Sequence, residues 1–251
     1  MRQTLIIVVA LYLVAATISV ETPAQEVIPA FVPFKVGERL TYSIRYGFAR
    51  AGTATLAVTD ILDCGQGKCY RVVSEARSTM PFSLFFEVQD SVISMMDVES
   101  LSTLRYEKRL KEGNYTKNEV IVFDQENHTA TYPDSSVIPV PPDVQDVLTS
   151  LYYLRTRSLE VGRTFLIENH ADKKNYPLEV KILRSETVSV PAGRFECFVV
   201  EPILKASGLF QHQGRLTVWL TKDSRLMPVM MTGKIIVGSV SAVLSEIEPG
   251  E

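Results

Sequence analysis

The chain has few of the residues on which catalysis and metal binding depend. Its 251 residues include three histidines, three cysteines and one tryptophan. His128, His170 and His212 lie far apart in polar contexts, and no two of them have the spacing of metal ligands. We therefore expect solvated loop histidines, with neither a metal site nor a general base among them.

Catalytic and phosphate-binding motifs are absent as well. The sequence contains no Gly-x-Ser-x-Gly nucleophile elbow and no glycine-rich phosphate loop. The formal net charge is -3, without a run of basic residues, so nucleic acid would be attracted only weakly. The expectation is a non-enzymatic protein with no cofactor, no metal and no nucleic-acid partner.

Charge is missing from a long stretch near the N-terminus. Arg2 is followed by an apolar run from Leu5 to about Val20, and small or polar residues such as Thr22 and Ala24 come next. A basic start, an apolar centre and small residues at a cleavage site are the three parts of a secretory signal peptide. The pattern predicts that the rest of the chain works outside the cytoplasm.

We expect residues 1–24 to be the cleaved signal and residues 25–33 to be a flexible, proline-containing leader. A spanning helix needs about 20 apolar residues, and this run is shorter. An uncleaved N-terminal membrane anchor remains the alternative. No cysteine lies in or just after the run, so lipid modification of an N-terminal cysteine is not expected.

The three cysteines are predicted to form one disulfide and one free thiol. Cys64 and Cys69 flank the turn of a predicted hairpin in VTDILDCGQGKCYRVVSEA, within reach of one another. An oxidising compartment favours a disulfide between them. Cys197 lies in FECFVVEP, where we expect a buried free thiol in a strand.

Most of the chain has the pattern of β-strands. Residues 40–46, LTYSIRY, alternate apolar and polar side chains, the period of a half-buried strand. Further short segments, rich in β-branched or aromatic residues and bounded by Gly, Pro, Asp or Asn, follow as far as KIIVGSV. Their close spacing favours an antiparallel meander over βαβ units, and the length after the predicted signal is enough for one large domain or two small ones.

One segment has the period of a helix instead. In DVQDVLTSLYYLRTRSLEVG, apolar residues recur at helical spacing, and we predict an amphipathic helix over residues 143–158. Asp143 is expected to cap its start, with Asp146 in the first turn. The predicted fold is a mainly β, antiparallel, strongly curved sheet or open barrel, with this helix on or inside it.

The segment TMPFSLFFEVQDSVISMMDV concentrates large apolar side chains around a proline. Methionine adapts to varied apolar ligands and aromatic rings offer large contact areas. One interpretation is the wall or lid of a hydrophobic groove; the alternative is ordinary core. The candidate ligand-binding residues are Phe82, Phe85, Phe86, Met95 and Met96.

Several segments resemble, in order, a known family. FKVGERLTYSIRYGFARAGTATLAV, DVLTSLYYLRTRSLEVGRTF, VPAGRFECFVVEP and RLTVWLTKDSRLMPVMMTGKIIVGSVSAVL are similar to the bacterial envelope family catalogued as domain of unknown function 3108. The resemblance covers roughly residues 34–248. It implies an exported protein of Gram-negative type with one β-rich domain in the periplasm. The family has no established activity, so no functional residue is carried over.

A second, weaker likeness concerns the pattern VWLTKDSRLMPV, which resembles hairpins of outer-membrane lipoprotein carriers, open barrels around a lipid-binding cavity. Our functional hypothesis is a periplasmic module that binds a lipidic or otherwise apolar envelope component. The alternative is a structural or interaction protein of the envelope, whose partner is another protein.

Overall fold

The structure is a computed structural model that describes residues 31–65, 67–203, 216–234 and 238–251. The predicted signal, residues 1–24, and most of the predicted leader lie outside the described residues. In the described part of the chain, no helix is long and apolar enough to cross a membrane.

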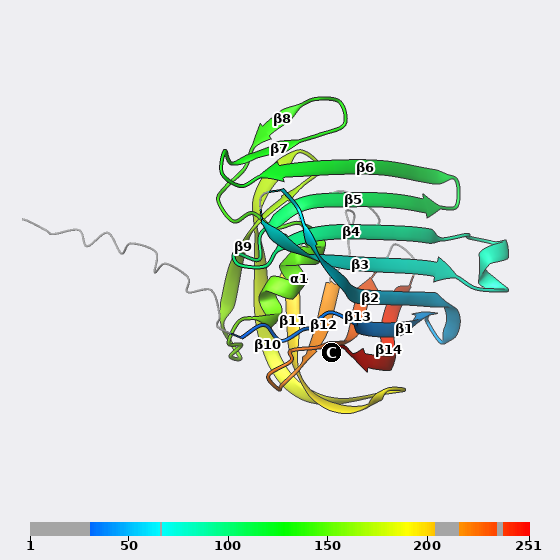
Figure 1. The fold of residues 1–251 in the computed structure, drawn as a ribbon. Coiled ribbons are helices and arrows are strands. Elements are labelled where there is room, and N and C mark those ends of the chain that lie inside the picture. The colour runs from blue at the N-terminus through cyan, green and yellow to red at the C-terminus, as the bar shows by residue number, and fades with distance from the viewer. Residues whose placement is uncertain (1–30, 66, 204–215, 235–237) are drawn as a thin grey trace, which may run out of the picture.

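The described residues form a strongly curved β-sheet with a helix on its concave side (Figure 1). The helices are the 3-10 turn η1 (Phe82–Leu84) and α1 (Val147–Arg155). The strands are β1 (Glu38–Tyr46), β2 (Ala49–Asp63), β3 (Lys68–Ser78), β4 (Gln89–Asp97), β5 (Thr103–Glu112), β6 (Tyr115–Asp124), β7 (Thr129–Thr131), β8 (Val137–Pro139), β9 (Thr164–Ala171), β10 (Lys174–Val190), β11 (Gly193–Ile203), β12 (Leu216–Thr221), β13 (Pro228–Lys234) and β14 (Ser239–Pro249).

All fourteen of these strands belong to one antiparallel sheet, in the order β8-β7-β6-β5-β4-β3-β2-β1-β14-β13-β12-β11-β10-β9. The chain starts at the middle of the sheet and runs outward to the edge strand β8. It then crosses to the opposite edge, β9, and returns to the middle, where β14 pairs with β1. The predicted antiparallel meander and open, curved sheet are confirmed.

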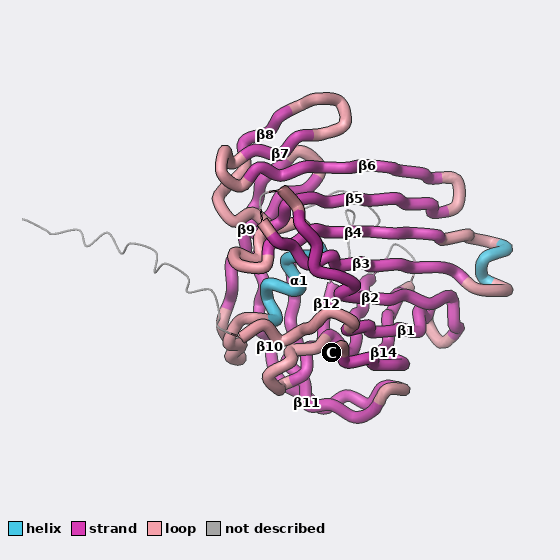
Figure 2. The backbone as a smooth tube through the Cα atoms, in the orientation of Figure 1, coloured by secondary structure: helices cyan, strands magenta, loops and turns pink. Residues whose placement is uncertain are grey.

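The connection between the two edges places α1 inside the fold (Figure 2). Strands β8 and β9 are the two edges of the sheet, and α1 lies in the segment that connects them. Two contacts join the regions of the two edges. Gln145, in the connection after β8, forms an isolated β-bridge with Asn169 of β9. The Asn175 side chain of β10 donates a 2.6 Å hydrogen bond to the Pro139 carbonyl of β8. The edges are therefore joined without continuous strand pairing.

The helix is shorter than its predicted range of residues 143–158, and its cap is a different residue. Asp146 is the N-cap, and its Oδ1 accepts hydrogen bonds from the backbone N–H groups of Leu148 and Thr149. The Thr149 hydroxyl in turn accepts from the Asp146 N–H, which completes a capping box. Asp143 has a φ of 52° and lies outside the helix. The prediction of Asp143 as the cap was wrong, because Asp146 satisfies the free N–H groups of the first turn.

The helix packs into the main hydrophobic core. Its buried side chains Leu148 and Tyr152 contact a cluster from the middle of the sheet that includes Leu40 and Tyr42. The rings of Tyr152 and Phe34 meet edge to face at 5.0 Å. The amphipathic pattern of this segment thus predicted which elements pack together, although not how far the helix extends.

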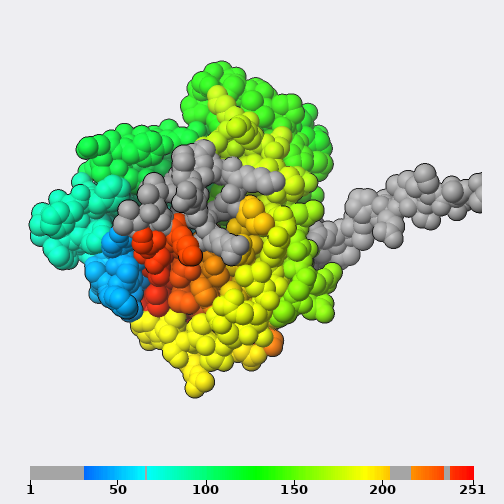
Figure 3. All heavy atoms as spheres, turned by 180° about the vertical axis from the view of Figure 1, so that it is seen from behind, coloured from blue at the N-terminus to red at the C-terminus, as the bar shows by residue number. Residues whose placement is uncertain are grey.

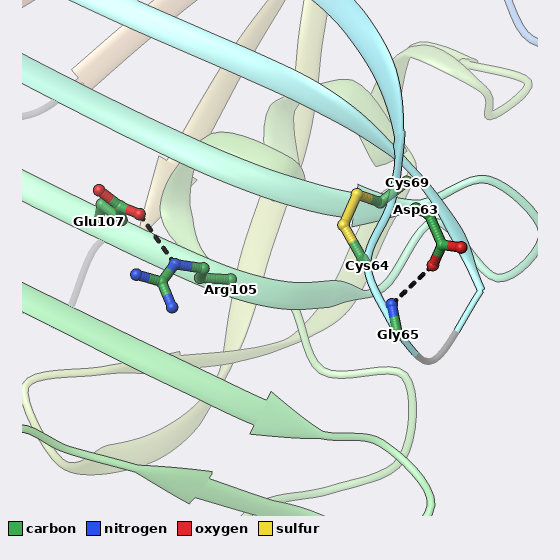
Figure 4. The surroundings of a disulfide bond; sticks show 6 residues. All are labelled: Asp63, Cys64, Gly65, Cys69, Arg105 and Glu107. Carbon is green, nitrogen blue, oxygen red and sulfur yellow. Dashed lines mark hydrogen bonds and ion pairs between the residues drawn. A yellow bond between two sulfur atoms is a disulfide. The ribbon is translucent and has the colours of Figure 1, made fainter.

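The predicted disulfide between Cys64 and Cys69 is present, with 6.1 Å between the two Cα atoms (Figure 4). It closes the β2–β3 turn, where Cys69 is in register with Leu62 and Cys64 lies just beyond the strand. Cys197 is a buried free thiol in β11, as expected. Burial raises its pKa to about 11, so the thiol stays protonated at neutral pH.

Candidate functional site

A cavity of about 280 Å³ lies between α1 and the concave face of the sheet. Apolar side chains from the helix and from strands of both halves of the sheet form most of its wall. The lining residues are Leu56, Ser74, Val92, Tyr106, Val147, Leu148, Ser150, Leu151, Leu154, Leu178, Val180, Val200, Pro202, Leu216, Val218 and Met231. No charged side chain is among them.

The helical wall follows from the spacing of one stripe of residues. Val147, Leu148, Leu151 and Leu154 are separated by one, three and three positions, so they project from the same side of α1. The same stripe carries residues that pack into the core. The cavity is therefore the part of the interface between helix and sheet that protein side chains leave unfilled.

The first half of the sheet contributes a row of side chains that lie opposite one another across neighbouring strands. Leu56 of β2 is in register with Ser74 of β3, and Ser74 is in register with Val92 of β4. Residues in register on adjacent strands point to the same face of a sheet. This row contributes part of the wall that faces the helix.

The second half contributes a similar row. Val200 of β11 is in register with Val218 of β12, which is in register with Met231 of β13. Val180 of β10 is opposite Pro202. Because these residues are apolar and face the interior, water in the cavity would find few hydrogen-bond partners there. The site is suited to an apolar molecule rather than to an ion or a sugar.

The polar groups in the wall are hydroxyls. Ser150 donates to the Asp146 carbonyl at 2.7 Å and accepts from the Asn169 side chain at 2.8 Å, so its hydrogen bonds are used within the protein. Burial, reinforced by the nearby carboxylate of Asp146, raises the pKa of Tyr106 far above its ordinary value. Tyr106 therefore remains a neutral phenol, and Ser74 is the third hydroxyl-bearing residue of the wall.

A buried polar network holds the start of the helix in place. The Thr103 hydroxyl donates to Asp146 Oδ2 at 3.0 Å, and the Thr103 and Thr149 hydroxyl oxygens are 2.7 Å apart. Burial raises the pKa of Asp146, while its hydrogen bonds with backbone N–H groups and hydroxyls act in the opposite direction. The network ties the start of α1, which forms part of the cavity wall, to β5.

The residues predicted to bind a ligand are not brought together by the fold. Met96 is fully buried in the main core cluster. Phe82, Phe85 and Phe86 lie in the turn between β3 and β4, at the far end of those strands, and Phe85 is 86% exposed. Met95 is half-buried in β4. None of the five lines the cavity, whose wall in β4 is formed by Val92 instead.

The expectation of solvated loop histidines was wrong for His170. It is buried in β9, where its Nε2 lies 2.7 Å from the Tyr132 hydroxyl and its Nδ1 lies 2.5 Å from Asn175 Oδ1. Burial lowers the pKa of His170, partly offset by the hydrogen bond with Asn175. His128 is exposed in a turn, as expected, and His212 lies outside the described residues. In the ranges that the structure describes, no group of three His, Cys, Asp or Glu side chains could hold a metal ion.

The residues of the cavity wall were not identified from the sequence as a site. Eight strands contribute one or two of them each, the helix contributes five, and most have the ordinary apolar pattern of a core position. The signal that could have pointed to them is the helix stripe, because an apolar stripe marks the side of the helix that faces the sheet. The strand partners depend on the register of the whole sheet.

Comparison with known proteins places the fold but assigns no activity. The model of the family described as "Protein of unknown function (DUF3108)" matches residues 41–245. The structure is similar to that of a β-barrel-like protein of the DUF1849 family from Brucella abortus, with a TM-score of 0.58 and 10% identity, over 86% of this chain and 98% of that one. It is also similar to a DUF1089 family protein from Pseudomonas aeruginosa, with a TM-score of 0.42 and 10% identity, over 72% and 89% of the two chains. No curated protein matches the sequence.

Proposed function

We propose that this protein, which belongs to the DUF3108 family of unknown function, is an exported periplasmic module. Its ligand is a lipidic or otherwise apolar component of the cell envelope. The ligand occupies the cavity between α1 and the concave face of the sheet. The single observation that carries this proposal is a wall without charged side chains around about 280 Å³ of space.

The size of the cavity limits the ligand class. Pockets for small molecules typically enclose about 300–1,000 Å³ and are mostly apolar. A cavity of about 280 Å³, just below that range, suits one acyl chain, or part of one, better than a whole diacyl lipid. Burial of apolar ligand surface at about 25 cal/mol per Å² supplies the affinity.

A binding role is supported over catalysis by how the buried polar groups are used. Both ring nitrogens of His170 are engaged by Tyr132 and Asn175, which leaves neither nitrogen for a substrate. Asp146 uses its carboxylate on the helix start and on Thr103. These groups maintain the fold around the cavity, and the proposed role does not require a reacting group.

Filling the cavity tests the proposal. Ser74 is a small residue of the wall on β3, and Ser74→Trp places an indole ring in the space that the ligand would occupy. The next residue, Glu75, points to the opposite face of the strand. Glu75→Trp is thus a matched control, with the same side chain added to the same strand outside the cavity.

The measurement is uptake of N-phenyl-1-naphthylamine, a neutral apolar dye, together with native mass spectrometry of gently extracted protein. We expect the wild type and Glu75→Trp to bind the dye and to carry co-purified lipid, and we expect Ser74→Trp to bind at least about tenfold less, with an unchanged melting temperature. Wild-type protein that takes up no dye and carries no apolar molecule would rule the proposal out. So would equal uptake by Ser74→Trp.

A further inference from the structure

Three neighbouring hairpin ends lie on one side of the molecule, at the right of Figure 1. All three expose large apolar side chains. They are the turns that join β1 to β2, β3 to β4, and β5 to β6. We call this surface the aromatic edge. Its members are Phe48, Met80, Leu84, Phe85, Phe86 and Tyr115.

Contacts between the turns make the aromatic edge continuous. The ring of Phe82 in η1 lies 5.8 Å from the ring of Tyr46 at the end of β1. On the other side, the ring of Phe86 lies so close to Gly113 that a Cβ at that glycine would be 3.0 Å from it. In the view from behind, the blue β1–β2 end and the cyan β3–β4 end also lie side by side (Figure 3).

These exposed side chains contribute little to the packing of the protein core. Phe48 is fully exposed and Phe85 is 86% exposed. Six of the fifteen exposed large apolar residues in the described ranges belong to the aromatic edge, among them four of the five exposed aromatic residues. Single exposed apolar residues are ordinary, but a contiguous group of this kind marks a surface that meets something else.

Positive charge surrounds the same strand ends. Arg45, Arg50, Arg77 and Lys234 are exposed there, and none of them forms an ion pair with another described residue. Arg45 and Arg50 are opposite one another on β1 and β2 and line a shallow groove together with Phe48. Acidic residues also lie at these ends. Glu87 in the β3–β4 turn pairs with Lys111 at 2.8 Å. Asp90 and Glu112 are half-buried, and burial raises the pKa of both carboxyls. This local positive charge stands out in a chain whose net charge is -3.

We propose that the aromatic edge docks the protein on the surface of a lipid bilayer that contains anionic lipid. Aromatic side chains at hairpin tips can enter the interfacial region of a bilayer, where amphipathic and aromatic groups are favoured. The four cations then face the negatively charged headgroups. The surface consists of separate projecting tips with a basic surround, which suits a fluid lipid surface better than the shaped surface of a protein partner.

Membrane docking goes beyond the proposed ligand binding and does not depend on it. The cavity wall and the aromatic edge share no residue. Where both hold, docking brings the cavity to the source of its ligand. The two proposals can therefore fail separately, and the cavity variant Ser74→Trp should bind vesicles as the wild type does.

The test is flotation of the full chain, purified after export, with vesicles of phosphatidylethanolamine and phosphatidylglycerol. The double variant Phe48→Ser/Phe85→Ser should lose about tenfold or more of its vesicle partitioning, since two rings no longer leave water. Both positions are exposed, so the melting temperature should not change. The matched control is Leu166→Ser on β9, which removes a side chain that is 68% exposed elsewhere on the surface.

A second pair of variants tests the charge. Arg45→Gln/Arg50→Gln should weaken binding to the anionic vesicles severalfold and reduce its sensitivity to salt, while Arg39→Gln on the other end of β1 should not. On vesicles of phosphatidylcholine, which carry no net charge, Arg45→Gln/Arg50→Gln and Arg39→Gln should bind equally weakly.

Three results would overturn docking through the aromatic edge. One is wild-type protein that does not float. Another is flotation of Phe48→Ser/Phe85→Ser equal to that of wild type, which would assign membrane binding to the N-terminal apolar segment or to another face. The third is self-association that disappears in the double variant without any flotation, which would assign the edge to a protein interface.

Discussion

The guanidinium of Arg155, at the end of α1, donates hydrogen bonds of 2.6 and 2.8 Å to the two carboxylate oxygens of Glu38 in β1. Both side chains are buried, and Arg155 Nε also donates to the Arg225 carbonyl at 3.2 Å. Burial by itself would lower the pKa of Arg155, but the hydrogen bonds and charge of Glu38 outweigh it and raise that pKa. The pair joins the last turn of the helix to the centre of the sheet.

Replacing Arg155 by Met should therefore destabilise the protein strongly. It leaves the Glu38 carboxylate buried without a partner, and such a change typically costs about 3–5 kcal/mol of unfolding free energy. Urea unfolding measures the loss. The control is Arg39→Gln, which breaks an exposed 3.9 Å contact with Glu248 and should cost less than about 1 kcal/mol.

The double variant Glu38→Leu/Arg155→Met sharpens this prediction. With both charges removed, no uncompensated group remains in the core, so much of the lost stability should return. A double variant no more stable than Arg155→Met alone would show that packing of the arginine side chain, rather than the ion pair, accounts for the loss.

His170 should make stability fall as the pH decreases. Burial lowers its pKa in the folded state below the ordinary value of 6.5, so protons bind the unfolded chain more tightly. The stabilisation is complete above the unfolded pKa and is lost as the pH falls from there toward the folded pKa. Nearby Asp172 and Glu119 oppose the effect but do not cancel it.

Urea unfolding at a series of pH values between about 7.5 and 5 tests this dependence. His170→Gln should flatten the curve in that window, although it also costs stability at every pH, because it disturbs the hydrogen bonds with Tyr132 and Asn175. His128→Gln, at an exposed turn, is the matched histidine control and should keep the wild-type slope. An unchanged slope in His170→Gln would contradict the prediction.

The apolar cluster predicted around residues 80–96 should separate into two groups under mutation. Met96 is fully buried, so Met96→Ala should cost about 2–5 kcal/mol of unfolding free energy. Phe85 is exposed, so Phe85→Ala should change stability by less than about 0.5 kcal/mol. Thermal or urea unfolding distinguishes them, and a large loss in Phe85→Ala would mean that the turn at η1 packs against the body of the protein.

Local patterns in the sequence predicted much of the fold. Alternation in segments such as residues 40–46 predicted strands, and the short turns between them predicted the antiparallel meander, because both signals come from neighbouring residues. The short spacing of Cys64 and Cys69 predicted their disulfide. The family resemblance is confirmed over residues 41–245.

The site could not be predicted in the same way. Phe85 and Met96 belong to one apolar segment, yet one is exposed at a hairpin tip and the other is in the core. His170 has a polar sequence context, yet Tyr132, which is 38 positions earlier in the chain, covers it where the sheet edges approach. In each case the exposure of the side chain depends on residues distant in the sequence, so its nearest neighbours in the chain do not determine it.

The sequence alone thus determined which segments are strands or helix, the antiparallel direction of the strands, and the Cys64–Cys69 disulfide. Each of these follows from side-chain periodicity or from short loops. Long-range packing set the remaining features: the helix on the concave face, the unfilled space beside Ser74, the buried pair of Arg155 and Glu38, and the exposed rings of the aromatic edge. These depend on how far fourteen strands curve and in which register they pair. Curvature and register are properties of the whole sheet, and no single segment encodes them.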